Sequence, residues 1–293
     1  MTLDQLRIFV EVAERGHLTQ AANALALTPS AVSASIRALE TRYGTHLFDR
    51  VGRGIEANET GRIFLVEAKA TLARARAAEL TLTELGGLMR GTLTIQASQT
   101  IASYWLPPLL IKFRQAYPLI EINLTVANTD NVTTSVLNGI ADLGFVEGKI
   151  DEPSLAIQTI DEDNIVAVVA PGHPWSGIKH IHPQDLLSGK WVLREPGSGT
   201  RAAFISMLQT YEVKLNDLHI ELTLPSNEAV RSAVMSGSYV TVVSELVVAS
   251  HLQAGLLHKV NIDLPKRSFY LLRHKERYKT KASMALEQII EQR

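Results

Sequence analysis

Apolar side chains recur at helical spacing through the first 58 residues, and turn signals divide them into short segments. Thr2 and Gln5 have the spacing of a capping box, which predicts a first helix that ends at Gly16. Its apolar face carries Leu6, Phe9, Val10 and Ala13. Thr19 is the expected N-cap of a second short helix over residues 20–26.

A third helix is predicted from Thr28-Pro29, an N-cap followed by a proline at the first helical position, through Tyr43. Gly44 would end it, and residues 45–57 then favour a β-turn or hairpin loop. One face of this helix is apolar and would pack on the first two helices: Val32, Ile36, Leu39 and Tyr43. Another face carries small hydroxyls and a base: Ser30, Ser33 and Arg37.

Three short helices with a tight turn before the third are typical of a helix-turn-helix DNA-binding unit. Serine hydroxyls allow a close approach to the groove, and Arg37 can bond to phosphate or to guanine. Arg50 and Arg53, in the turn after the third helix, would suit a wing along the DNA backbone. The alternative is a plain three-helix capping module with a solvated serine and arginine face.

Residues 58–85 contain strong helix formers without an interior proline. A seam with coiled-coil-like spacing, interrupted by Glu79, runs along it: Leu65, Ala68, Leu72, Ala75 and Leu82. The pattern predicts a dimerising linker helix, and the alternative is a solvated connector. Gly86-Gly87 would close the helix and mark a domain boundary.

From Gly91 onward, strand and helix patterns alternate, which predicts an α/β domain with parallel strands. Further strand-like runs lie at 164–170, 190–194, 219–224, 239–243 and 268–273. About 200 residues of this pattern favour two lobes, with crossovers near 160–164 and 265–268. The expected domains are 1–58, 59–88 and 91–293, with lobe I formed by 91–161 and 268–293 and lobe II by 162–267.

Composition narrows the function classes. The 293 residues include 29 Lys and Arg, 30 Asp and Glu, and no cysteine, which excludes a disulfide scaffold, a thiol nucleophile and a thiol redox sensor. No apolar run is long enough to span a membrane, and the N-terminal sequence lacks the basic start of a signal peptide, so we expect a cytoplasmic protein. The net charge of the whole chain does not indicate DNA binding, although residues 28–54 contain four arginines and only two acidic residues.

The motifs together resemble the N-terminal signature of LysR-type transcriptional regulators. The resemblance rests on Leu3, Leu6 and Phe9, on the runs 29–33 and 36–40, and on Leu47-Phe48-Asp49-Arg50 and Thr60-Gly61. It covers the whole chain and implies a winged helix-turn-helix, a dimerising linker helix and a two-lobed, periplasmic-binding-protein-like effector domain. The expected DNA-binding residues are Thr28, Ser30, Ser33, Ser35, Arg37, Arg50 and Arg53. Ala34 stands where many members carry Arg or Gln, so a base contact from that position is lost.

Small ligands of two-lobed α/β domains sit between the lobes, at the carboxyl ends of strands. The stretch 191–201, WVLREPGSGTR, predicts a strand, a Gly/Ser/Thr turn and the start of a helix, which suit an anion cradle. The alternative is a glycine-rich turn that only caps a helix. The expected ligand-binding residues are Ser98, Gln99, Thr100, Thr129, Glu147, Glu195, Ser198, Gly199 and Thr200.

The run 194–201 resembles the subgroup of LysR-type regulators that control carbon fixation and sulfite and cysteine metabolism. This resemblance implies a small anionic effector: a sulfur oxyanion or a phosphorylated or carboxylated compound. The expected partners are double-stranded promoter DNA, a second copy or three further copies of the chain, and RNA polymerase, with no cofactor and no membrane.

Other chemistry is weakly indicated. His173, His180 and His182 make a poor metal signal, and Ser198 has no general base nearby in sequence, so neither a metal centre nor an enzyme is expected. The acids 161–163 are expected to be solvated, and Trp105 to be core. A solute-binding protein with an α/β cleft and no DNA role is the alternative function.

Overall fold

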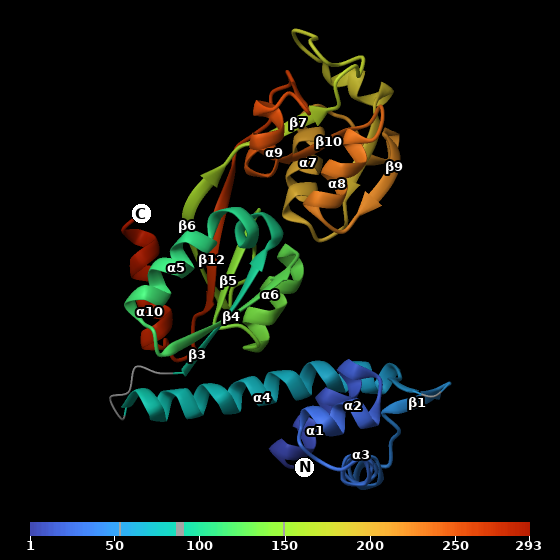
Figure 1. Cartoon of the computed structure of the whole chain (residues 1–293). Helices are drawn as coiled ribbons and strands as arrows, with labels where there is room; N and C mark the ends of the chain where they lie inside the picture. Colours follow the sequence, from blue (N-terminus) through green and yellow to red (C-terminus); the bar gives the residue numbers. More distant parts are fainter. Residues whose placement is uncertain (53, 86–90, 149) are drawn as a thin grey trace. The chain divides into compact units, whose positions relative to one another are not determined.

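The computed structural model describes residues 1–52, 54–85, 91–148 and 150–293, which form two compact units (Figure 1). Arg53 and the predicted boundary at Gly86-Gly87 lie outside the described residues. Within the described ranges, no helix is both long and apolar enough to cross a membrane.

The first unit begins with three helices, α1 (Leu3–Arg15), α2 (Leu18–Ala24) and α3 (Pro29–Tyr43). Thr2 and Gln5 form the predicted capping box, and Gly16 ends α1 in the left-handed conformation. Thr28 caps α3 as predicted. The N-cap predicted at Thr19 is wrong, because the ring Nδ1 of His17 accepts the Thr19 amide and α2 begins two residues earlier.

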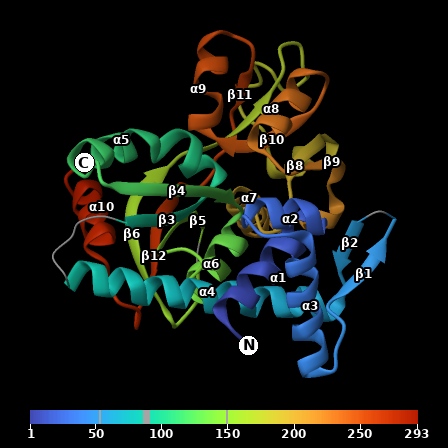
Figure 2. The same ribbon diagram turned by 60° about the horizontal axis from the view of Figure 1, so that its bottom comes forward.

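The core of this unit gathers the inward faces of the three helices: Leu6, Phe9, Val12, Ala21, Ala22, Val32, Ile36 and Leu39. The prediction that Tyr43 joins it is wrong, because this last residue of α3 is 54% exposed. A two-stranded antiparallel hairpin comes next, β1 (Phe48–Val51) with β2 (Gly54–Ala57). Figure 2 shows the hairpin beside α3 and α1 lying along the next helix, α4.

Helix α4 (Glu59–Leu85) confirms the predicted long helix, but the residues of its predicted apolar seam lie in two different environments. Ala68 is buried in the core of the first unit, and Leu65 and Leu72 pack against the same core. Leu82 is instead 72% exposed. The first half of the predicted seam therefore stabilises the chain's own winged helix, because it faces α1.

In the second unit, the first five-stranded sheet has the order β4-β3-β5-β12-β6. Its parallel strands are β3 (Gly91–Ser98), β4 (Ile120–Ala127) and β5 (Leu143–Glu147). Strand β12 (Arg267–His274) pairs antiparallel with β5 and with β6 (Leu155–Asp163). Two helices, α5 (Pro107–Ala116) and α10 (Lys281–Glu291), contribute to the core on one face, and α6 (Thr129–Asn138) packs on the other.

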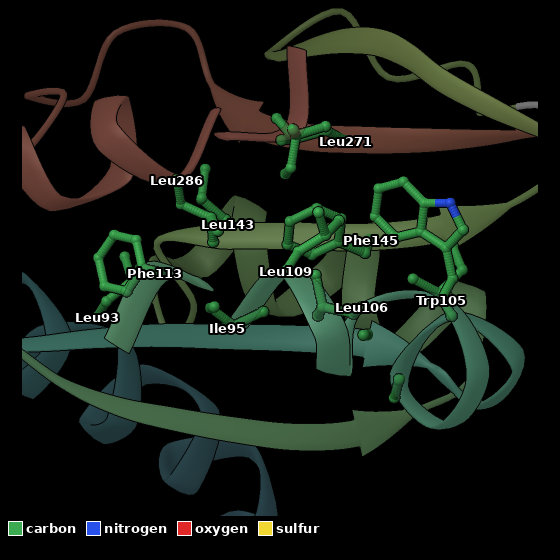
Figure 3. Packing of buried hydrophobic residues seen from close by; sticks show 14 of the residues in the cluster. Leu93, Ile95, Trp105, Leu106, Leu109, Phe113, Leu143, Phe145, Leu271 and Leu286 are labelled. Atoms are coloured by element: carbon green, nitrogen blue, oxygen red, sulfur yellow. The ribbon is translucent and has the colours of Figure 1, made fainter. Parts of the chain in front are cut away.

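A five-residue π-helical turn, η1 (Ile101–Trp105), connects β3 to α5. Trp105 lies at one end of the core formed by Leu143, Phe145 and their neighbours (Figure 3). Its indole is almost fully buried, which confirms the prediction that Trp105 is core.

The second sheet has the order β11-β7-β10-β8-β9. Its strands are β7 (Ile165–Val169), β8 (Lys190–Arg194), β9 (His219–Leu224), β10 (Val240–Ser244) and β11 (His258–Val260). The α-helices of this lobe are α7 (Gly199–Thr210), α8 (Asn227–Met235) and α9 (Glu245–Gln253), with short 3-10 turns at Pro183–Ser188 and Leu215–Asp217.

The chain passes between the sheets twice: at Asn164, between β6 and β7, and through 261–266, between β11 and β12. The first crossover falls within the predicted 160–164, whereas the second begins before the predicted 265–268 and overlaps it only at residues 265–266. The two lobes are therefore linked by adjacent strands, an arrangement that permits a hinge.

Candidate DNA-binding surface and effector cleft

Helix α3 presents the hydroxyl and arginine face that the sequence predicted. Ser30 and Arg37 are exposed, and Ser33 and Ser35 are half-buried beside the buried face of the helix. The Thr28 hydroxyl accepts the Ala31 amide and lies 3.0 Å from the Ser30 hydroxyl. Within the described part of the chain, Arg37 forms neither a hydrogen bond nor an ion pair, so its guanidinium can meet a phosphate.

The hairpin is anchored to the helices by contacts that sequence analysis missed. The Glu40 carboxylate accepts the Leu47 amide at 2.8 Å, and the Asn58 side chain bridges the His46 carbonyl and the Gly61 amide. A Cβ on Gly61 would lie 2.0 Å from the Leu47 carbonyl oxygen, so only glycine permits this approach. Arg50 is exposed on β1 of the anchored hairpin.

The predicted ligand-binding residues lie at the ends of β3, β5 and β8 and at helix starts beside them. Ser98, Thr100, Thr129, Glu147, Ser198 and Thr200 are buried polar residues. The Thr129 hydroxyl donates to the Glu147 carbonyl, and a Cβ on Gly199 would approach that same oxygen within 2.4 Å. The start of α7 in lobe II therefore contacts the end of β5 and the start of α6 in lobe I.

Arg267, which the sequence analysis missed, joins these elements from the first position of β12. Its guanidinium donates to Asp163 at 2.7 Å, to the Thr200 hydroxyl at 2.9 Å and to the Thr100 hydroxyl at 3.4 Å. It also lies 3.5 Å from a Glu147 oxygen. One buried cation thus connects residues at both crossovers with residues of both lobes.

The prediction that Asp163 is a solvated loop acid is wrong. Asp163 is 3% exposed, receives the Ser244 hydroxyl at 2.7 Å and pairs with Arg267. Burial raises the pKa of Asp163, and the Arg267 charge only partly opposes that effect. The sequence signal for this pair was position, because Asp163 and Arg267 both lie within the predicted crossovers.

A second polar chain joins the two lobes through Asn227, a fully buried residue at the first position of α8. Its side chain accepts from Arg194 at 2.6 Å and donates to Thr100 at 3.2 Å, while its backbone N–H donates to the Gln99 side chain. Arg194 in turn pairs with Glu195 through two hydrogen bonds, which fix the position of the Glu195 carboxylate.

Two charged residues beside this site, Glu228 and Arg201, bond within the protein. Glu228 accepts from Gln99 at 3.1 Å and from the Tyr104 hydroxyl at 3.0 Å, so it joins the two lobes. Burial, with Glu228 nearby, raises the pKa of Tyr104. Arg201 donates to the Arg194 carbonyl, so part of its guanidinium is engaged within lobe II.

Two unpaired polar atoms lie among these residues. Among the described residues, the Ser98 hydroxyl and one Glu147 carboxylate oxygen are buried without a hydrogen-bond partner. Buried polar groups are nearly always satisfied, so these two atoms are natural contacts for a bound molecule. No group of three or more potential metal ligands occurs in the described ranges.

Two family models together match almost the whole chain. The bacterial regulatory helix-turn-helix protein model of the lysR family matches residues 3–62, and the LysR substrate binding domain matches residues 86–293. The chain is 35% identical to the uncharacterized HTH-type transcriptional regulator YeiE of Escherichia coli K12, over 96% of this chain and 94% of that protein. It is 34% identical to a probable RuBisCO transcriptional regulator of Nostoc sp. PCC 7120, over 99% and 87%.

Solved structures share the fold. Full-length CbnR in complex with its target DNA superposes with a TM-score of 0.73 at 21% identity, covering 100% of this chain and 99% of that one. The CcmR regulatory domain of Synechocystis PCC6803, in complex with 2-PG, gives 0.63 at 27% identity, over 69% and 97%. The two family models and the length of these matches lead to one conclusion: the chain belongs to the LysR family of DNA-binding transcriptional regulators.

Proposed function

We propose that this LysR-type regulator binds promoter DNA through α3 and the β1–β2 wing, and that a small anionic effector held between the two lobes modulates that binding. The observation that supports DNA binding is the division of α3, with one face buried in the core and a more exposed face bearing Ser30, Ser33 and Arg37. Thr28 caps the start of the helix, and Ser35 lies half-buried on its other side. Arg50 on the wing, with Arg53 outside the described residues, supplies phosphate contacts.

The DNA proposal is tested by Ser33→Glu, which places a carboxylate against the phosphates. We expect this variant to lose promoter binding in a gel-shift assay while its circular dichroism is unchanged. Gln115→Glu, exposed on α5, adds the same charge elsewhere and should bind normally. Unchanged binding by Ser33→Glu would contradict the assignment.

We propose that α4 mediates assembly into a homodimer or homotetramer. A stripe of apolar residues at spacings of three and four remains available on α4: Ile63, Val66, Ala70, Ala73 and Ala77. Ile63 is 66% exposed and Val66 47% exposed, in contrast to Leu65 and Ala68 on the core side. Val66→Glu should lower the mass measured by light scattering, whereas the exposed Glu67→Gln should not. Two assembled copies would place two recognition helices on two half-sites.

The effector proposal rests on the orphaned atoms and the chemistry around them. Asp163 and Glu147 already compensate the charge of Arg267, so neutral donors must hold the anion. Such donors are the Ser98 hydroxyl and the backbone amides at the start of α7, which Ser198 caps. The partnerless Glu147 oxygen favours an effector that also carries a hydroxyl or an acidic proton. Regulators named for RuBisCO and the 2-PG complex of CcmR support a phosphorylated or carboxylated compound, with a sulfur oxyanion as the other class.

A thermal-shift screen of small oxyanions and hydroxy acids against the full chain tests this effector class. Thr200→Val removes one acceptor of Arg267 and should abolish the shift, whereas Thr223→Val, exposed on β9, should retain it. A shift that persists in Thr200→Val would place the effector elsewhere. Effector binding would then change the lobe arrangement and the spacing of DNA contacts, with RNA polymerase as the partner downstream.

The chain is assigned no reaction and no cofactor in this proposal. The alternative, a solute-binding protein without a DNA role, is disfavoured by the helix-turn-helix match over residues 3–62. Gel-shift and effector titration on the same preparation separate the two, because a solute-binding protein would respond to the ligand only.

A further inference from the structure

A cavity of about 220 Å³ lies at the first crossover, and residues of both lobes line it. Lobe I contributes Trp105, Asp161, Phe269 and Arg293, and lobe II contributes Asn164, Glu245, Leu246 and Ala249. None of these residues was predicted to bind the effector. The cavity is therefore a feature of the hinge separate from the residues assigned to the effector cleft.

The lining is acidic. Its carboxylates are Asp161, Glu162, Asp163 and Glu245, against the single cation Arg293. Asp163 is neutralised by Arg267, and Glu162 and Glu245 meet the exposed Lys266 and Lys259 only at 3.5 Å. Exposed pairs of that length are weak, so the lining itself carries more carboxylates than cations, although each carboxylate has a cationic partner within 4 Å.

An aromatic face and a carboxylate are combined at one end of the cavity. The Trp105 indole N–H donates to Asp161 at 2.6 Å, which orients the carboxylate beside the ring. The Arg293 guanidinium carbon lies 5.1 Å from the centre of the Trp105 ring, and the guanidinium is paired with Asp161. A ring face together with a carboxylate is the arrangement that recognises organic cations, and here a guanidinium already occupies it.

Arg293 is a replaceable occupant. Its side chain is 48% exposed, and it borders both this cavity and a neighbouring one of about 410 Å³ that Gln158 and Ile290 also line. Hydrogen bonds from the Trp105 indole and from the Glu162 amide hold the Asp161 carboxylate in place, and together with the Arg293 guanidinium they lower its pKa against the effect of burial. The two hydrogen bonds would keep the carboxyl group in position if Arg293 left.

We infer that this hinge cavity binds a small organic cation, an alkylammonium or alkylguanidinium, which takes the place of the Arg293 guanidinium at Trp105 and Asp161. Leu246, Ala249 and Phe269 provide an apolar wall for the alkyl part. A volume below the roughly 300–1,000 Å³ of drug-sized sites limits the ligand to a few heavy atoms. A metal ion is not favoured, because the described residues hold no cluster of metal-ligating side chains.

A cation bound in this cavity would affect the residues proposed to hold the effector. Asp163 lines the cavity and also holds Arg267, which contacts Thr100 and Thr200. Because the lining comes from both lobes, a cation bound there would favour one lobe arrangement over another. The binding claim itself does not depend on the anionic effector.

The test monitors the indole N–H resonance of Trp105 in the full chain, labelled with ¹⁵N and titrated with methylguanidinium or n-butylammonium chloride at constant ionic strength. Trp105→Phe identifies the resonance among the three tryptophans. We expect a saturable shift of this resonance, with the Trp175 and Trp191 resonances unmoved. Arg293→Ala should bind the probe several-fold more tightly, because the internal competitor is gone.

Asp161→Asn in the Arg293→Ala background isolates the carboxylate, and it should weaken binding about tenfold or more. Asp151→Asn, an exposed acid outside the cavity lining, should leave the affinity unchanged. N-methylurea, a neutral analogue of the guanidinium probe, should produce no saturable shift. An unmoved Trp105 resonance in Arg293→Ala, an equal response to N-methylurea, or unchanged affinity after Asp161→Asn would each overturn the inference.

Discussion

Replacing Arg267 with methionine would leave two buried carboxylates without their cation. The side chains of Asp163 and Glu147 are 1% and 3% exposed, and both face the guanidinium. Removing one partner of a buried ion pair costs about 3–5 kcal/mol, because the remaining charge is neither hydrated nor paired. We therefore expect the free energy of unfolding of the effector domain to fall by about that amount at neutral pH. Burial raises the pKa of Asp163, so the cost should shrink as the pH falls and that carboxyl takes up a proton.

Urea denaturation monitored by tryptophan fluorescence measures this loss, because all three tryptophans lie in the second unit. Lys266→Met is the matched control. Its ammonium is largely exposed and meets Glu162 at 3.5 Å, so its loss should change stability by no more than about 0.5 kcal/mol. Adding Asp163→Asn to Arg267→Met should restore part of the stability. A loss below about 1 kcal/mol with an unchanged m-value, or a double variant no better than the single one, would refute the reasoning.

Three further changes test separate parts of the structure. Gly61→Ala should destabilise the winged-helix unit by about 1–3 kcal/mol, since its Cβ would meet the Leu47 carbonyl; normal stability in hydrogen exchange of the wing would contradict this. Gly199→Ala should separate the start of α7 from Glu147 and weaken the effector-induced thermal shift without changing promoter affinity in the absence of effector. Burial lowers the pKa of His173, so the unfolded chain alone takes up a proton below about pH 6.5 and stability falls there. His173→Asn keeps an acceptor for the Trp175 amide and should flatten that dependence in urea midpoints measured from neutral pH to pH 5.

Local signals predicted the first unit well. Thr2, Thr28 and Gly44 act at helix ends through contacts with residues three or four positions away, and such short-range contacts can be predicted from a sequence. The predicted start of the second helix was wrong because His17 and Thr19 both have side chains that can accept a backbone N–H, and in the structure His17 is the N-cap. The first half of the predicted dimerisation seam of α4 was wrong, because the spacing of apolar residues does not reveal whether they pack on α1 of the same chain or on a second chain.

The effector domain was predictable in class and in its crossovers, but not in its central residue. Strand β6 was not predicted, because it ends in a run of acids and few of its residues are buried, Asp163 being one of them. Ser98, Thr100, Thr129 and Thr200 were predicted to bind the effector because of their positions at strand ends and helix starts, and the structure buries all four. Arg267 and Asp163 are 104 residues apart, and only the pairing of β12 with β6 brings them together. Long-range ion pairs of this kind leave no periodic signal in one sequence.

The π-helical turn η1 constrains how this domain can change its length. Thr100, just before the turn, bonds to Asn227 across the lobes, and Trp105, its last residue, lines the hinge cavity. A π-turn holds one residue more than an α-turn, so a one-residue deletion here can be absorbed by a change to an α-turn, whereas a further inserted residue would turn α5 by about 100° relative to β3. After such an insertion, either Thr100 or Trp105 would leave its place. Relatives that keep both contacts should therefore lack insertions in this segment, while insertions accumulate in loops away from it.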